Sequence, residues 1–224
     1  MAEGDLDRRV RRTLTALRAA VVELVADKGY QAVTVDHICE RADVTRATFY
    51  SHFRDKEHLL SSVADDLVDR CLDAFEAAGG GIDHRGERLV VLFEHARTDE
   101  TAFGLVLRGE GDGAALRRLR DRLTAIVAET MELHRRTLRT TPAVPMTVMT
   151  QMCVGEILTV LAWWLDPDGD TDGDADTADA RTVVSWLRAT GLYGRLWALG
   201  ADDTALARPR AAAFRAGLPP KELT

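Results

Sequence analysis

The sequence predicts an all-α protein, and two observations carry that prediction. Apolar residues return at intervals of three and four along most of the 224 residues, and no run alternates apolar with polar side chains between turn signals. The prolines are few and stand between the periodic segments, where proline starts or stops a helix. Hydrophobic residues make up 46% of the chain, which supports a packed core and excludes disorder throughout.

The distribution of charge predicts two domains with different roles. The whole chain carries a net charge of −7, which excludes nucleic-acid binding by bulk positive charge. Residues 8–58, however, hold ten basic and seven acidic side chains, a net charge of +3, so the remainder carries −10. We therefore predict a mildly basic head, residues 1–58, on an acidic body, residues 59–224.

Cysteine usage and hydropathy predict a cytoplasmic protein. Cys39, Cys71 and Cys153 form neither a C-x-x-C pair nor a cluster with histidine, so no disulfide framework, zinc site or other metal site is expected. The first twelve residues lack the apolar run of a signal peptide. The most apolar stretch, residues 146–165, contains five polar side chains and predicts a buried helix instead of a membrane span.

The head begins with a long helix and a short one. Residues 8–28 carry an apolar stripe and are followed by Gly29, which supplies the positive φ that ends the first helix. Thr34 can cap a second helix of about two turns, whose buried face comprises Val35, Ile38, Cys39 and Ala42. A helix this short needs a partner to be stable.

A third helix follows after a turn of only a few residues. Thr45 can cap this helix, and Phe49 and Phe53 are one turn apart on its inward side. Two short helices joined by a tight turn form a helix-turn-helix. The opposite arc then holds the small residues Ala47 and Ser51, which suit entry into a DNA groove about 12 Å wide.

Longer polar side chains flank this arc. Arg46, Tyr50 and His52 lie at its edges, next to Thr48. Asp55 can cap a fourth helix that begins with Lys56, whose ammonium and free helix amides favour phosphate. The pattern predicts that small residues let the tip of the third helix enter the groove, and that the longer donors at its edges reach bases and phosphates.

Residues 34–57, TVDHICERADVTRATFYSHFRDKE, closely resemble the DNA-binding signature of TetR/AcrR-type transcriptional regulators. The resemblance implies a three-helix helix-turn-helix domain followed by a helical ligand-binding and dimerisation domain, with about nine helices in all. It implies that Arg46 and Ala47 contact bases; Ser51 shares their outward arc by helical spacing. It assigns phosphate contacts to Thr34, Thr45, Thr48, Tyr50, His52 and Lys56.

Two residues depart from the family pattern. Asp43 stands in the turn where the family usually has glycine, at a position that needs positive φ, so we expect a strain of roughly 1 kcal/mol. Cys39 replaces a small alanine. Neither change is expected to abolish the fold.

The body is predicted to consist of further helices near residues 86–98, 100–107, 114–137, 145–165 and 180–199. The last two have apolar arcs too broad for one buried stripe, which favours a two-fold homodimer over a wholly intramolecular core. For that interface we predict Ile157, Leu161, Trp164, Val184 and Leu187. For the pocket of a small-molecule effector we predict Phe75, Phe93, Phe103, Leu107, Met131, His134, Met149, Met152 and Cys153.

These features predict a homodimeric repressor that binds a palindromic double-stranded DNA operator and leaves it when a small ligand binds. No cofactor and no enzymatic activity are expected, because the chain lacks a nucleophile elbow, a Walker loop and a dinucleotide fingerprint. The alternative is a helical protein without DNA binding that responds to a small ligand or to calcium. Residues 168–179 place aspartates at calcium-loop spacing, but position 12 is aspartate instead of glutamate, so an acidic connection is the preferred interpretation.

Overall fold

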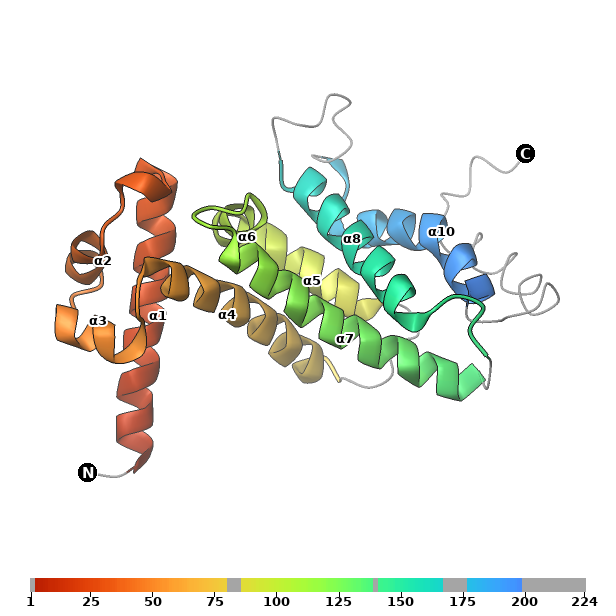
Figure 1. Cartoon of the computed structure of the whole chain (residues 1–224), viewed down its shortest axis with the longest axis horizontal. Coiled ribbons are helices and arrows are strands. Elements are labelled where there is room, and N and C mark those ends of the chain that lie inside the picture. Colours follow the sequence, from red (N-terminus) through yellow and green to blue (C-terminus); the bar gives the residue numbers. More distant parts are fainter. Residues whose placement is uncertain (1–2, 80–85, 139–140, 167–176, 199–224) are drawn as a thin grey trace. The chain divides into compact units, whose positions relative to one another are not determined.

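Figure 1 shows the computed structural model of the chain, which describes residues 3–79, 86–138, 141–166 and 177–198. Helices are the regular secondary structure of these ranges, as the sequence predicts: nine α-helices and one 3-10 helix, η1. Their bounds are α1 Glu3–Lys28, η1 Tyr30–Ala32, α2 Val35–Arg41, α3 Arg46–His52, α4 Lys56–Ala77, α5 Glu87–Thr98, α6 Glu100–Leu107, α7 Ala114–Leu138, α8 Met146–Trp164 and α10 Ala180–Ala198.

The chain divides into two compact units, and the predicted head lies within the first. This unit comprises Met1–Arg70 and Asp99–Leu119, and the second comprises Cys71–Thr98 and Arg120–Thr224. The predicted helices agree with the observed bounds to within a residue or two. The exception is α1, which begins at Glu3 and so extends beyond the predicted start near residue 8.

The first unit is organised around α1, which packs against η1, α2 and α6, while α2 packs against α3. The core side chains Leu17, Ile38, Phe49 and Leu59 are completely buried. Because α2 and α3 have seven residues each, they are too short to be stable alone in water. Their position therefore depends on apolar contacts with the longer helices.

The turn between α2 and α3 contains a strained residue, as the sequence predicts. Asp43 has φ = 52°, the one positive φ of a non-glycine residue within the described ranges. The chain reverses here through hydrogen bonds from Asp43 N to Glu40 O (3.3 Å) and from Val44 N to Cys39 O (3.0 Å). Aspartate tolerates this region better than most residues, at a cost of about 1 kcal/mol.

The second unit has its own aromatic core. In it, α10 packs against α5 and α8. The rings of Phe93 and Trp164 are 5.5 Å apart, and the guanidinium of Arg97 lies 4.3 Å from the Trp164 ring. The indole N–H of Trp164 donates to the carbonyl of Ala178 at 3.1 Å. These contacts join α5, α8 and the segment that leads into α10.

The start of α10 is fixed by Asp179, whose carboxylate accepts a hydrogen bond from the backbone N–H of Thr182 at 2.7 Å. This bond holds the pKa of Asp179 below its ordinary value. The residue that would be position 12 of a calcium loop is thus a helix cap here. Residues 168–176, which carry the other aspartates of that pattern, lie outside the described residues.

Helix α8 is buried mainly on one side. Over its most apolar 18 residues the mean hydropathy reaches 1.4, so α8 is long and apolar enough to cross a membrane. Only 33% of these residues are buried within the protomer. Length and composition alone do not indicate a membrane location, because core helices pass the same test. Within one protomer one side of α8 is buried and the other is exposed, as expected for an apolar arc too broad for one buried stripe.

We predict that Asp43→Gly stabilises the first unit by up to about 1 kcal/mol, because glycine adopts φ = 52° without steric cost. Asp43→Ala keeps the steric cost and should destabilise the unit. Urea denaturation monitored by circular dichroism gives both free energies of unfolding. A destabilised glycine variant would show that the aspartate side chain matters more than the backbone strain.

Candidate nucleic-acid interface

The start of α2 is fixed by a reciprocal pair of hydrogen bonds. The hydroxyl of Thr34 accepts from the backbone N–H of His37 at 3.2 Å, and the backbone N–H of Thr34 donates to Nδ1 of His37 at 3.4 Å. The predicted cap at Thr34 is thereby confirmed, and His37 adds a second bond that the sequence analysis missed. The spacing of a capping box could have revealed it, with histidine in place of the usual glutamate.

The start of α3 is also capped by a threonine hydroxyl. Thr45 Oγ1 accepts from the backbone N–H of Thr48 at 3.2 Å, and the two hydroxyls are 2.9 Å apart. Further along the helix, Phe49 is completely buried and Phe53 is 5% exposed, with 5.9 Å between their rings. Both expectations, the Thr45 cap and the inward phenylalanines, are confirmed.

Burial of these rings turns the opposite side of α3 outward. We call this side the α3 surface; its exposed members are Arg46, Ala47, Tyr50 and Ser51, and Thr48 and His52 are half-buried at its edges. The Tyr50 side chain is 50% exposed, unusual for a ring of this size. A narrow surface of small residues flanked by a guanidinium and a phenol fits a major groove.

The hydroxyl of Ser51 has a local partner. It donates to the carbonyl of Thr48 at 2.7 Å. A phosphate accepts hydrogen bonds and does not donate them, so Ser51 has to leave this carbonyl before it can contact a phosphate. The role of Ser51 on this surface is therefore that of a small side chain, because its hydroxyl proton is already used within the helix.

Lys56 also has partners within the protomer. Its ammonium donates to the carbonyls of Tyr30 (3.0 Å) and Val33 (2.9 Å) and lies 4.1 Å from the Tyr30 ring. An ammonium has three protons, so one remains for a phosphate. The contact predicted for Lys56 thus involves a side chain that also holds η1 against the start of α4.

The fourth helix begins as predicted. The carboxylate of Asp55 accepts from the backbone N–H of His58 at 2.6 Å, which confirms the cap. Next to it, the Tyr30 phenol donates to Glu57 at 2.6 Å. Burial first, and then the Glu57 carboxylate, raise the pKa of Tyr30 far above its ordinary value, so this phenol stays protonated.

The sequence analysis missed a further neighbour of Tyr30, the loop between α6 and α7. Gly109, Gly111 and Gly113 all have positive φ in this loop. A Cβ on Gly111 would lie 2.7 Å from Cζ of Tyr30, closer than side chains pack. Three glycines alternating with acidic residues were the signal that could have revealed a tight loop.

The basic residues near the start of the head lie on the first turns of α1. Arg8, Arg9, Arg11 and Arg12 have exposed side chains on this helix. Among the described residues there is no group of three or more histidine, cysteine, aspartate or glutamate side chains that could hold a metal ion.

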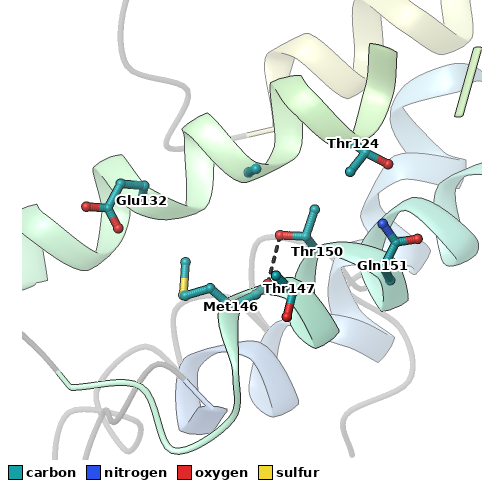
Figure 2. Close-up of a pocket in the computed structure, with 7 residues that line it drawn as sticks. Thr124, Glu132, Met146, Thr147, Thr150 and Gln151 are labelled. Carbon is teal, nitrogen blue, oxygen red and sulfur yellow. Dashed lines mark hydrogen bonds between the residues drawn. The ribbon is translucent and has the colours of Figure 1, made fainter. Parts of the chain in front are cut away.

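The second unit contains a cavity of about 190 Å³ between α7 and α8, shown in Figure 2. Its lining consists of Thr124, Ala128, Glu132, Met146, Thr147, Thr150 and Gln151. Hydrogen bonds from Arg135 and Arg136 lower the pKa of Glu132 to about 2, so the carboxylate is ionised and already neutralised. The cavity therefore offers hydroxyls and apolar surface, without an unpaired charge.

None of the nine side chains predicted to line a pocket lines this cavity. Met131 and Met149 form a buried pair beside it, packed against Cys153, and Thr150 touches the sulfur of Met131 at 3.7 Å. Phe75 and Phe93 are core residues, His134 is half-buried, and Met152 is 65% exposed. Phe103 and Leu107 belong to the first unit. The lining prediction is thus not supported at this cavity.

The five side chains predicted for the dimer interface are buried within one protomer. Ile157, Leu161, Trp164, Val184 and Leu187 are each at most 3% exposed. A side chain already covered by its own chain has little area left for a second one. The apolar arcs of α8 and α10 are real, but the predicted residues form the inner side of these helices.

A three-helix head with capped α2 and α3 and an exposed α3 surface defines a helix-turn-helix domain. Residues 17–63 match the family model described as bacterial regulatory proteins, tetR family. Residues 17–63 are thus similar to the DNA-binding domain of this family, as the sequence signature indicates.

Curated proteins with similar sequences include helix-turn-helix transcriptional regulators. The uncharacterized HTH-type transcriptional regulator YxbF of Bacillus subtilis is 40% identical over 72 residues, covering 32% of this chain and 19% of YxbF. The transposon Tn10 TetC protein of Escherichia coli is 36% identical over 72 residues, covering 32% of this chain and 36% of TetC. The match thus spans about a fifth to a third of the length of these curated relatives.

Solved structures extend the likeness to the whole fold. A TetR-family transcriptional regulator from Syntrophomonas wolfei has a TM-score of 0.64 at 20% identity, covering 83% of this chain and 96% of that one. The structure of AibR with isovaleryl coenzyme A and operator DNA has a TM-score of 0.50 at 18% identity, covering 79% and 97%. At these identities the comparison establishes the fold, including a helical second domain.

We predict that Gly111→Ala destabilises the first unit by about 2–4 kcal/mol, because it combines backbone strain with a collision against the Tyr30 ring. Gly109→Ala is the matched control. It has a similar φ, +68° against +77°, but its nearest neighbour would be 3.7 Å away, so it should lose only about 1 kcal/mol. Equal losses in urea denaturation would show that Tyr30 does not constrain the loop.

Proposed function

We propose that the protein is a sequence-specific DNA-binding transcriptional regulator, a homodimeric repressor that a small ligand releases from a palindromic operator. The observation that carries the proposal is the α3 surface. Its backbone is fixed by the Thr45 cap and the buried Phe49, and it presents Arg46, Ala47 and Tyr50 outward. The match to the tetR family over residues 17–63 supports the same assignment.

The division of roles follows from the donors on this surface. Arg46 is the first residue of α3, at the tip of a helix that enters a groove, and a guanidinium can bond two acceptors of guanine. Thr34, Thr45, Thr48, Tyr50, His52 and Lys56 surround the tip and are proposed to contact phosphates. The local charge of +3 in residues 8–58 favours the approach of DNA despite the acidic body.

The function is tested by fluorescence anisotropy with duplexes from the region upstream of its own gene and with random duplex, over a range of salt concentrations. We expect specific binding that weakens steeply with salt. Tyr50→Phe and Lys56→Ala should weaken binding to all duplexes, whereas Arg46→Ala should also reduce discrimination by about 1–3 kcal/mol.

Lys28→Ala, an exposed lysine at the end of α1, is the matched control and should bind like the parent. If the folded parent prefers no fragment over random duplex at low salt, the protein is not an operator-binding regulator.

The homodimer is supported by the outer side of α8. Val148, Met152, Gly155, Thr159 and Ala162 are exposed and recur at intervals of four and three; we call them the α8 face. The face carries no charge, and Trp186 on α10 is 38% exposed. An uncharged helix side with this spacing is typical of a helix-packing interface. A second copy that covers it pairs two heads, so that each contacts one half of a palindrome.

We predict that Met152→Glu weakens the dimer at least 100-fold, because it places an unpaired carboxylate in each half of the interface, at a cost of about 3–5 kcal/mol. The protomer should stay folded, since Met152 is 65% exposed. Leu133→Glu, at an exposed apolar residue of α7 outside the α8 face, is the matched control. Sedimentation velocity measures the dissociation constants, and a Met152→Glu variant that dimerises like the parent would contradict this interface.

The ligand response is supported by the cavity between α7 and α8. A volume of about 190 Å³ is below the range typical of drug-sized ligands, which favours a small effector. Its hydroxyls come from Thr124, Thr147 and Thr150, and Glu132 is neutralised by its arginine neighbours. We propose an uncharged, largely apolar effector with one or two polar groups. The structure of AibR holds both a ligand and operator DNA, which is consistent with a family member that responds to a ligand.

A further inference from the structure

Arg46 is paired with a carboxylate from the neighbouring helix. Asp36 lies in the first turn of α2, and its two oxygens are 2.9 Å and 3.1 Å from Nη1 of Arg46. Both side chains are well exposed, 60% for Arg46 and 64% for Asp36. Neither the sequence signature nor the family match assigns a role to Asp36.

The geometry of this pair confines the carboxylate to one nitrogen of the guanidinium. Both carboxylate oxygens contact Nη1, and the Tyr50 side chain also forms a hydrogen bond with the guanidinium. The other two nitrogens, Nε and Nη2, form one of the edges by which arginine bonds two acceptors at once. Guanine presents two such acceptors, O6 and N7, in the major groove.

A second neighbour restricts Arg46 from along its own helix. Tyr50 follows it by four residues, and the guanidinium carbon is 5.9 Å from the centre of the Tyr50 ring. Contact with the Tyr50 side chain first, and then the Asp36 carboxylate, raise the pKa of Arg46, so the group stays charged. A free arginine side chain has about 2 kcal/mol of rotamer entropy, part of which these two neighbours remove before DNA binds.

We propose that Asp36 is a specificity-determining positioning residue: it holds Nη1 of Arg46 so that the Nε–Nη2 edge is presented to a guanine of the operator. The inference rests on the proposed function, because it assumes that α3 enters the major groove. It adds a residue of α2 to the determinants of sequence preference.

Because Asp36 is negatively charged, its removal should change the affinity for random duplex and the base preference in opposite directions. A carboxylate beside the duplex repels phosphates, and by pairing with Arg46 it also reduces the attraction of that guanidinium for any phosphate within reach. Removal of Asp36 should therefore strengthen binding to random duplex while it weakens the preference for guanine. A residue with a purely structural role would weaken binding to all sequences together.

The test is selection of bound duplexes from a randomised library, followed by sequencing, for the parent, Asp36→Ala, Asp36→Asn and Arg46→Ala. The parent should enrich a guanine at one position of each half-site, and Arg46→Ala should lose that enrichment. Asp36→Ala should reduce enrichment at the same position at least about threefold and leave the other positions unchanged. Asp36→Asn, whose amide oxygen still accepts a hydrogen bond, should be intermediate.

Two controls separate the proposal from general effects. Glu40→Gln removes an exposed negative charge from the same helix, outside the Asp36–Arg46 pair, and should keep the parent's base preference. Affinity for random duplex, measured by anisotropy, should rise about twofold or more for Asp36→Ala. Thermal unfolding identifies the temperature at which all variants are folded, since an acidic residue in the first turn stabilises α2.

The outcomes are distinguishable. If the parent enriches no sequence, the proposed function and this inference both fail. If the parent enriches a guanine that depends on Arg46 but the Asp36 variants keep it, only the inference is overturned. It is also overturned if Asp36→Ala weakens binding to all duplexes equally, or if the enrichment does not depend on Arg46.

Discussion

The candidate interface depends on the burial of Phe49. Helix α3 has seven residues, and a helix of that length is not stable in water by itself. The Phe49 ring is completely buried and Phe53 is 5% exposed. Full burial of one such ring contributes about 1.5–3 kcal/mol. Because helix geometry relates each side chain to the next by about 100°, inward phenylalanines fix which side of α3 turns outward.

Polar groups around this core serve the fold first and leave a few donors for a ligand. Thr34 and Thr45 cap their helices, and Lys56 holds two carbonyls around η1. Each buried or half-buried polar group must find a partner, so the head satisfies them internally. Beside the α3 surface, one proton of Lys56 remains for a ligand, together with the exposed side chains of Arg46 and Tyr50. Donors held in fixed positions favour selectivity over tight binding to any polyanion.

In the second unit, the outer side of α8 exposes uncharged surface to water. Its inner side, with Ile157, Leu161 and Trp164, is completed by the protomer's own core. The exposed residues of the outer side carry no charge. Only 33% of the most apolar 18 residues of α8 are therefore buried within the protomer. Exposed apolar surface of this kind is unfavourable in water, and a covering surface lowers its free energy. In the proposed homodimer, covering this side of α8 pairs two heads for one duplex, which relates the apolar side of the body to the proposed function of the head.

Local patterns in the chain were enough to predict the helices and the caps at Thr34, Thr45 and Asp55, and the family resemblance indicated the positive φ at Asp43. Each of these depends on residues within one or two turns of each other, and their chemistry has few alternatives. The inward phenylalanines were predictable for the same reason, since helical spacing is local. The family resemblance then indicated which outward residues to examine.

Tertiary structure alone decided which partners those residues have. Asp36 and Arg46 are ten residues apart, Lys56 bonds carbonyls more than twenty residues earlier, and Gly111 approaches Tyr30 from another helix pair. The sequence likewise could not separate the inner from the outer side of α8, because a broad apolar arc fits both a core and an interface. Pattern gives the direction of a side chain relative to its own helix axis, whereas its neighbours depend on how separate helices pack, which is a property of the whole chain.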